Sequence, residues 1–130
     1  MTPILTRGEL AAALAQPRAF LFLYVNWATQ ARHSLLVARQ VVAEWQAEHP
    51  DAPAPGYMVD VSDECGEVWD ALVEWVTAEG RSGQLLMSGV GPLLWVRDGR
   101  VVLHVPGALS YGAAKLAAAS RSAFAAERDH

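Results

Sequence analysis

The hydrophobic positions of this chain form two kinds of pattern, short unbroken apolar runs and longer stretches with a helical period. An unbroken apolar run at residues 19–25 predicts a strand that is buried on both faces. After a short polar turn, apolar residues recur at helical spacing over 29–48, where Leu35, Ala38 and Trp45 share one face. Because a strand here runs into a helix, the turn between them lies at the carboxyl edge of the predicted sheet, where α/β folds place their sites.

Weaker patterns on either side predict the remaining elements. Thr6 and Glu9 have the spacing of a capping box, which predicts a helix that begins there and ends before Pro17. Two apolar runs joined through Asp98 and Gly99 predict a β-hairpin, because this dipeptide favours the tight turn between antiparallel strands. The other expected elements are a short edge strand at 3–5, a proline-rich connection at 49–56, a strand at 57–61, a helix at 64–79, an ambiguous stretch at 84–87 and a last helix whose N-cap is Ser110.

The order of the expected elements predicts a fold of the α/β class. It is helix, strand, helix, strand, helix, hairpin, helix. The first two strands are joined by a crossover helix and should be parallel, while the hairpin adds antiparallel strands. The sequence thus predicts a three-layer α/β/α sandwich around a mixed sheet of about four strands. With 130 residues, of which 52% are hydrophobic, the chain is expected to form one domain over 1–130.

Composition and charge argue against several classes of partner. The net charge of -4 is mild and no basic stripe occurs, so nucleic acid is not an expected partner. No apolar run approaches the roughly 18–20 residues of a membrane span, so no membrane association is predicted. The amino terminus lacks a charged segment followed by a long apolar one. The sequence therefore predicts no signal peptide, and the expected compartment is the cytoplasm.

The chain has a single cysteine, Cys65, and four histidines. One cysteine excludes an intramolecular disulfide, CxxC chemistry and a cysteine-based zinc site, and the histidine spacing fits no metal site. No cofactor is predicted. Cys65 is the candidate nucleophile, near the start of the 64–79 helix, where the helix dipole favours a thiolate. Asp63, Glu64 and Glu67 oppose that effect, so an inert thiol and a reactive one both stay open.

Three segments of the chain, taken in order, resemble the thioredoxin family. The first is the apolar strand that ends in Trp27, with Arg32 where thioredoxins carry a basic residue after their second cysteine. The second, residues 59–61, is similar to the family's valine-and-aspartate strand. The third, residues 89–102, is similar to the family's cis-proline strand and hairpin, with Pro92 as the cis-proline. The resemblance covers most of the chain and implies a thioredoxin-like sandwich.

The departures from the family concern its chemistry. The two cysteines of the active-site turn are replaced by Ala28 and Ala31. Thioredoxin chemistry needs a low-pKa thiolate at a helix N-terminus and a second thiol that resolves the mixed disulfide. The family's buried acid is also absent, with Phe22 and Leu23 at the candidate positions, and Leu36 stands near the place of the helix-kinking proline. The comparison therefore implies a redox-inactive protein that is not a dithiol–disulfide oxidoreductase.

In the family, the active-site turn and the cis-proline loop form a groove that holds an extended peptide. The resemblance therefore implies a protein- or peptide-binding accessory module, whose partner the sequence does not identify. Gly91 would offer its backbone to the peptide in a strand-like pairing. Trp27 has two open interpretations, an exposed binding anchor or a packing residue over the Pro92 loop. The matching groove residues are Trp27, Ala28, Thr29, Gln30, Ala31, Arg32, Gly91 and Pro92.

Two other functions stay open at this stage. The first is a single-cysteine thiol enzyme or redox sensor that uses Cys65. The second is a structural homodimer, suggested by the apolar 64–79 helix, which carries Trp69 and Trp75. His33, in the first turn of the 29–48 helix, is expected to be solvated rather than to line a groove.

Overall fold

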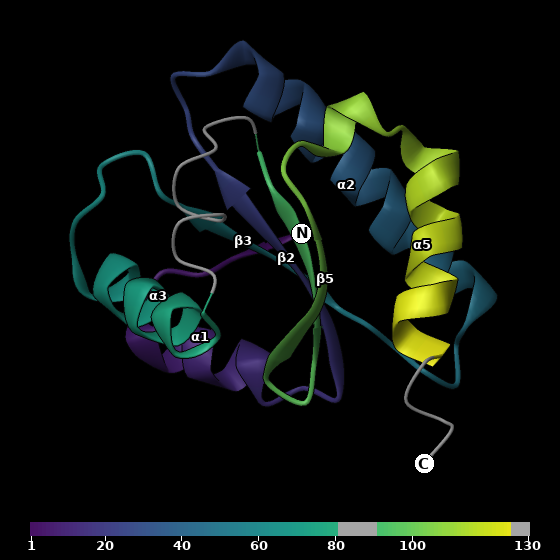
Figure 1. Ribbon diagram of the computed structural model, residues 1–130, viewed down its shortest axis with the longest axis horizontal. Helices are drawn as coiled ribbons and strands as arrows, with labels where there is room; N and C mark the ends of the chain where they lie inside the picture. Colours follow the sequence, from purple (N-terminus) through teal and green to yellow (C-terminus); the bar gives the residue numbers. More distant parts are fainter. Residues whose placement is uncertain (81–90, 126–130) are drawn as a thin grey trace.

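The computed structural model describes residues 1–80 and 91–125, and a mixed β-sheet lies at its centre (Figure 1). The order of strands across the sheet is β1-β3-β2-β4-β5. β1 and β2 run parallel to β3, whereas β4 runs antiparallel to β2 and to β5. The predicted mixed sheet is therefore confirmed. The edge strand expected at 3–5 is β1, which is shorter and begins one residue earlier. The strands are β1 (Thr2–Pro3), β2 (Arg18–Tyr24), β3 (Gly56–Asp60), β4 (Leu93–Arg97) and β5 (Arg100–Val105).

Helices cover both faces of the sheet. In the described part of the chain they are α1 (Arg7–Leu14), α2 (Thr29–Glu48), α3 (Glu67–Ala78) and α5 (Ala113–Ala125), with a short 3-10 helix, η1 (Ala108–Ser110), before α5. α1 and α3 lie on one face, and α2 and α5 lie side by side on the other (Figure 1). This is the predicted three-layer sandwich. Within residues 1–80 and 91–125, no helix is both long and apolar enough to span a membrane.

Strand β2 is central because it is buried on both faces. Ala19, Leu21 and Leu23 point into the core under α1 and α3. Phe20 and Phe22 point into the core under α2 and α5. All five side chains are at most 2% exposed. A strand with a helical layer on each face has no solvent-facing side, and this explains the unbroken apolar run in the sequence.

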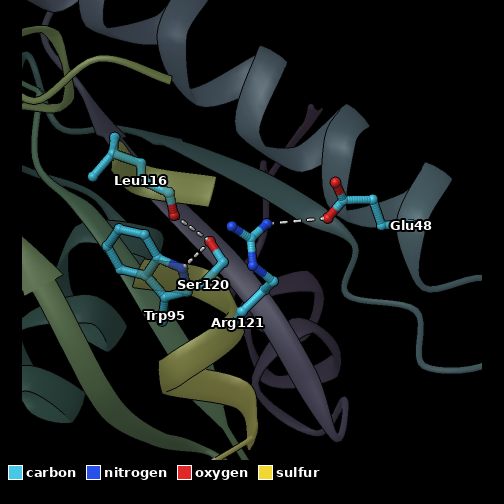
Figure 2. Close-up of polar contacts among 5 residues, drawn as sticks. All are labelled: Glu48, Trp95, Leu116, Ser120 and Arg121. Carbon is cyan, nitrogen blue, oxygen red and sulfur yellow. Dashed lines mark hydrogen bonds and ion pairs between the residues drawn. The ribbon is translucent and has the colours of Figure 1, made fainter. Parts of the chain in front are cut away.

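A buried polar pair fixes the last helix to the sheet. The Trp95 indole Nε1 on β4 donates a hydrogen bond of 2.7 Å to Ser120 Oγ on α5, and both residues are at most 1% exposed (Figure 2). Ser120 Oγ in turn donates to the carbonyl oxygen of Leu116 at 2.8 Å. A serine therefore sits in an apolar core because the buried indole N–H needs an acceptor.

The local signals for the hairpin and the first helix are confirmed. Asp98 and Gly99 have φ angles of 51° and 81°, the two positive values that a type I′ turn requires. Thr6 caps α1, because its Oγ1 accepts a hydrogen bond of 3.0 Å from the backbone N–H of Glu9. The Glu9 carboxylate reaches back one residue further than in a standard capping box, to the N–H of Leu5 at 2.6 Å.

Two predicted helix starts are wrong, each because of a backbone with positive φ. α3 begins at Glu67, three residues after the expected start, because Glu64 and Gly66 have φ angles of 51° and 98°. Ser110 does not cap the last helix. It ends η1, and α5 begins three residues later, after Gly112 with a φ of 81°. The ambiguous stretch at 84–87 lies outside the described residues.

Trp69 and Trp75 on α3 serve the core. Both are partly buried and pack against the core between the sheet and the α1–α3 layer. The Trp75 indole Nε1 also donates a hydrogen bond of 2.9 Å to the carbonyl oxygen of Gly99 in the hairpin turn. These contacts account for the wide apolar face of α3 within one chain, so the face is not by itself a sign of a homodimer.

Candidate functional site

The turn between β2 and α2 lies at the carboxyl edge of the sheet and is held to the loop that follows β3. The backbone N–H of Asn26 donates to Ser62 Oγ at 2.8 Å, and the N–H of Val61 donates to the carbonyl oxygen of Tyr24 at 2.8 Å. The N–H of Ser62 donates to Asp60 Oδ1 at 2.9 Å. The two loops at this edge therefore support each other.

Trp27 stands exposed on this turn. Its side chain is 68% accessible to solvent, so the interpretation as a packing residue over the Pro92 loop is not borne out. Arg32 on the first turn of α2 reaches back and donates from Nη2 to the carbonyl oxygen of Asn26 at 3.3 Å. Because hydrogen bonds hold the turn, the exposed Trp27 ring is positioned to enter a pocket on another molecule.

Ala28 and Ala31 occupy the start of α2. Ala28 is the N-cap residue and has no side chain that could accept a hydrogen bond from the helix, while Ala31 is fully buried. The N–H of Ala31 donates back to the Ala28 carbonyl oxygen at 3.1 Å. Neither methyl group can act as a nucleophile or gain a charge. Ala28 and Ala31 therefore give the start of α2 neither a thiol nor another reactive group.

Gly91 and Pro92 lie next to β2 and are both buried. The N–H of Leu23 donates to the carbonyl oxygen of Pro92 at 3.0 Å, and the N–H of Ala108 donates to that of Gly91 at 3.4 Å. Gly91 is expected to offer its backbone to a peptide, and its carbonyl oxygen already accepts one hydrogen bond within the chain, from Ala108. A Cβ at Gly91 would come within 2.8 Å of the Phe22 ring, so glycine is required there.

The prediction that Pro92 is a cis-proline is wrong. No cis peptide bond occurs in residues 1–80 and 91–125, so the bond between Gly91 and Pro92 is trans. The chain changes direction at Gly91 instead, which has a φ of 83°, in the left-handed region that glycine enters without strain.

A cavity of about 330 Å³ opens beside the turn, between the start of α2 and η1. Gln30, one helical turn after Trp27, is the predicted groove residue that lines it. Leu109 and Tyr111 line the other wall and are each 41% exposed. The N–H of Leu109 donates to the buried Ser34 Oγ at 3.0 Å and ties η1 to α2. Sequence patterns missed these walls, because an apolar residue in a loop carries no periodic signal.

Cys65 is exposed and lies between the end of β3 and Gly66, the N-cap of α3. Because β2 and β3 are parallel, Cys65 belongs to the same sheet edge as Trp27. Two acidic residues are close to Cys65 in the sequence. Asp60 accepts a hydrogen bond from the backbone N–H of Ser62, and Glu64 is exposed. In the described residues, no group of three or more histidine, cysteine, aspartate or glutamate side chains could hold a metal ion.

His33 and His49 lie outside the turn, on α2 and just after it. His33 is exposed on α2, as expected. His49 follows the other end of α2, where its ring stacks on Trp45 with centroids 3.8 Å apart.

Comparison with solved structures decides the fold. The chain aligns over 95% of its length with 93% of thioredoxin O2 from Arabidopsis thaliana, with a TM-score of 0.61 and 20% identity. It has the thioredoxin fold. A Plasmodium falciparum thioredoxin gives a TM-score of 0.63 at 11% identity, with 94% of this chain and 96% of that one covered. A Malassezia sympodialis thioredoxin gives 0.62 at 14% identity, with 95% and 90% covered. No family model and no curated protein matches the sequence.

The TM-scores and coverages establish the thioredoxin fold, whereas identities this low leave the chemistry to be argued from the residues themselves. Two of the similar structures are described as oxidised thioredoxins, a state of those proteins. This thioredoxin-like chain has one cysteine, Cys65, which follows β3 rather than β2. Ala28 and Ala31 therefore leave the turn after β2 without a thiol.

Proposed function

We propose that this thioredoxin-like chain is a redox-inactive binding module that holds a protein or an extended peptide at the carboxyl edge of its sheet. The observation that carries the proposal is the 68% exposure of Trp27 on a turn that hydrogen bonds hold in place. Leu109 and Tyr111 beside the turn are exposed as well, and neighbouring exposed apolar residues mark an interaction site more often than a single one does. A rigid aromatic anchor loses little conformational entropy on binding.

The surroundings of Trp27 favour a partner with an apolar side chain and backbone polar groups. The cavity beside the turn offers Leu109 and Tyr111 as apolar walls. Gln30 and Lys115 supply hydrogen-bond donors at its rim. The Gly91 carbonyl oxygen already accepts one hydrogen bond from Ala108, so side chains are expected to contribute to holding the partner beside any strand-like pairing at Gly91.

A displayed library of random peptides, selected on the immobilised protein, tests this proposal. We expect the selected peptides to lose about thirtyfold in affinity, or about 2 kcal/mol, when Trp27→Ala replaces the wild type. Val102→Ala is the matched control, because Val102 is 40% exposed on β5 and lies level with the start of β2, at the end of the sheet opposite to the turn. A failure to select any peptide, or equal binding by the Trp27→Ala variant, would contradict the proposal.

A thiol role for Cys65 is the second candidate, and the exposure of its side chain favours it. The test compares the rate of iodoacetamide alkylation of the folded protein at neutral pH with that of N-acetylcysteine. A rate about ten times higher than that of the small thiol would support a reactive cysteine, and an equal rate would assign Cys65 as an ordinary exposed thiol.

A homodimer is the remaining alternative, and the mass of the protein in solution tests it. We expect a monomer in sedimentation velocity at micromolar concentration, because Trp69 and Trp75 already pack within the chain. A sedimenting species with twice the mass of the monomer would favour the structural subunit instead.

A further inference from the structure

Two segments of the chain that meet beside the Trp27 turn contain no acidic residue. They are residues 26–43, with the turn and most of α2, and residues 99–125, with β5, η1 and α5. The whole chain has 14 acidic residues and a net charge of -4, whereas these two segments carry four arginines and Lys115, the single lysine of the sequence. Every residue that lines the cavity of about 330 Å³ belongs to one of them. The cavity therefore lies in a basic part of an acidic protein.

Two cations on α5 differ in their partners. Arg121, near the end of the helix, pairs with Glu48 on α2 at an Nη1–Oε1 distance of 3.3 Å (Figure 2). Lys115, in the first turn of α5, lines the cavity. Its side chain forms neither a hydrogen bond nor an ion pair with any residue in 1–80 or 91–125. The ammonium group of Lys115 is therefore a charged donor that still needs an acceptor.

The remaining residues of the chain hold few acids. Residues 81–90 contain none, and Arg81 is their single charged residue. Glu127, the first acidic residue after Lys115, comes after the end of α5 at Ala125. Ala125 lies ten residues beyond Lys115, which is about 15 Å along a helix. The acceptor for Lys115 is thus to be sought on another molecule.

The first turns of α2 and α5 both face this cavity, through Gln30 and Lys115. Neither first turn contains an acidic residue, whereas α1 and α3 each have one or two there. A carboxylate close to a helix N-terminus is stabilised by the helix dipole. An acid supplied by a partner would therefore add to its pairing with Lys115 a favourable interaction with two helix ends.

The other side of Trp27 has the opposite charge. The loop after β3 carries Asp60, Asp63 and Glu64, which are all exposed. β3 lies on one side of β2 in the sheet, and β4 and β5, which lead to the cavity, lie on the other. A peptide acid is therefore attracted on the cavity side of Trp27 and repelled on the β3 side.

From these observations we propose that the partner held at the Trp27 turn is an extended acidic peptide, one of whose carboxylates enters the cavity and pairs with Lys115. This inference rests on the proposed function, which leaves the charge of the partner open. An apolar side chain of the peptide covers Trp27, and the neighbouring acid lies between Leu109, Tyr111 and Lys115. The acidic loop after β3 sets the direction, because the acid must point away from it.

The peptides selected from the displayed random library test the charge of the partner. We expect them to contain more aspartate and glutamate than the unselected library. The net charge of -4 would by itself favour basic peptides, so general attraction cannot produce this result. Selected peptides that need Trp27 but are neutral or basic would overturn the acidic partner and leave the binding module intact. A failure to select any peptide would overturn both.

Amide substitution in the peptide measures the contribution of the carboxylate. Each selected peptide is synthesised with a dye, together with a copy in which its aspartates and glutamates are replaced by asparagine and glutamine. Fluorescence polarisation should show that the copy binds the wild type about threefold to tenfold more weakly, the range of an accessible ion pair. Equal affinities of the two peptides would overturn the proposal.

Variants assign the carboxylate to Lys115. Lys115→Gln should weaken the acidic peptide by about threefold to tenfold and leave the amide copy unaffected, whereas Lys115→Arg should keep most of the affinity. Arg39→Gln is the control, because Arg39 is exposed on α2, belongs to the same acid-free segment and does not line the cavity. Equal losses in Lys115→Gln and Arg39→Gln would show a general charge effect and overturn the pairing with Lys115.

Discussion

The backbone N–H of Asn26 donates a 2.8 Å hydrogen bond to the side-chain oxygen of Ser62, and this bond joins the turn after β2 to the loop after β3. Ser62 can hold this position because its own N–H is bonded to Asp60. The turn that carries Trp27 is thus supported by the loop after β3, through a residue 36 positions further along the chain. Support of this kind reduces the entropy that Trp27 would lose on binding a partner.

Removal of the supporting hydroxyl should therefore affect binding without touching a contact residue. Ser62→Ala is expected to lower the free energy of unfolding by about 1 kcal/mol, the usual contribution of one hydrogen bond, and to weaken peptides selected on the wild type. Urea unfolding and peptide titration measure the two effects. Asp63→Ala is the control, because Asp63 is the exposed neighbour in the same loop. Unchanged peptide affinity in Ser62→Ala would contradict a supporting role.

Gly91 offers a sharper test of packing behind the site. A Cβ there would lie 2.8 Å from the Phe22 ring and 2.9 Å from Ser34 Cβ, at a φ of 83°. Gly112 has nearly the same φ, 81°, and no atom within 4 Å of the added Cβ. We expect Gly112→Ala to cost about 1 kcal/mol from backbone strain and Gly91→Ala to cost about 2–4 kcal/mol, because overpacking is added. Equal midpoints in urea would contradict the close approach at Gly91.

The sequence allowed the fold to be predicted where the signal was local. Asp98 and Gly99 favour their turn through backbone preference alone. The unbroken apolar run of β2 indicates burial on both faces of the strand. The position of the turn after β2 followed from the same logic, since a strand that enters a helix ends at the sheet edge. These features need no knowledge of what lies on neighbouring strands.

The parts that could not be predicted depend on distant partners. The exposure of Trp27 depends on which loops pack beside it, and the sequence pattern left both outcomes open. Gln30 and Lys115 line one cavity only because α2 and α5 pack side by side. The bond before Pro92 is trans, where the resemblance implied a cis bond, and Gly91 before it has a positive φ of 83°.

The buried pair of Trp95 and Ser120 should contribute to stability. Ser120→Ala removes the acceptor of a fully buried indole N–H, and we expect it to lower the free energy of unfolding by about 1–3 kcal/mol. The better helix propensity of alanine offsets about half a kcal/mol of this loss. Ser122→Ala is the matched control on the exposed face of the same helix and should be neutral or slightly stabilising. Urea unfolding followed by tryptophan fluorescence measures both, and equal effects would contradict the importance of the pair.

Substitution of cysteines separates the thioredoxin fold from thioredoxin chemistry. The wild type should not catalyse insulin reduction by dithiothreitol, because Ala28 and Ala31 provide no thiol. The double variant Ala28→Cys, Ala31→Cys places two thiols three residues apart at the start of α2, close enough to form a disulfide. The double variant should therefore gain measurable catalysis, whereas each single variant should not, because one thiol cannot resolve a mixed disulfide.

The rate of the double variant should stay below that of a thioredoxin for two structural reasons. Phe22 and Leu23 leave the central strand without a buried acid, and the bond before Pro92 is trans. The turbidity of precipitating insulin measures the rate, with a thioredoxin as the reference. Catalysis by the wild type would contradict the proposal of a redox-inactive module, and an inert double variant would mean that the scaffold around the turn does not support the geometry of the reaction.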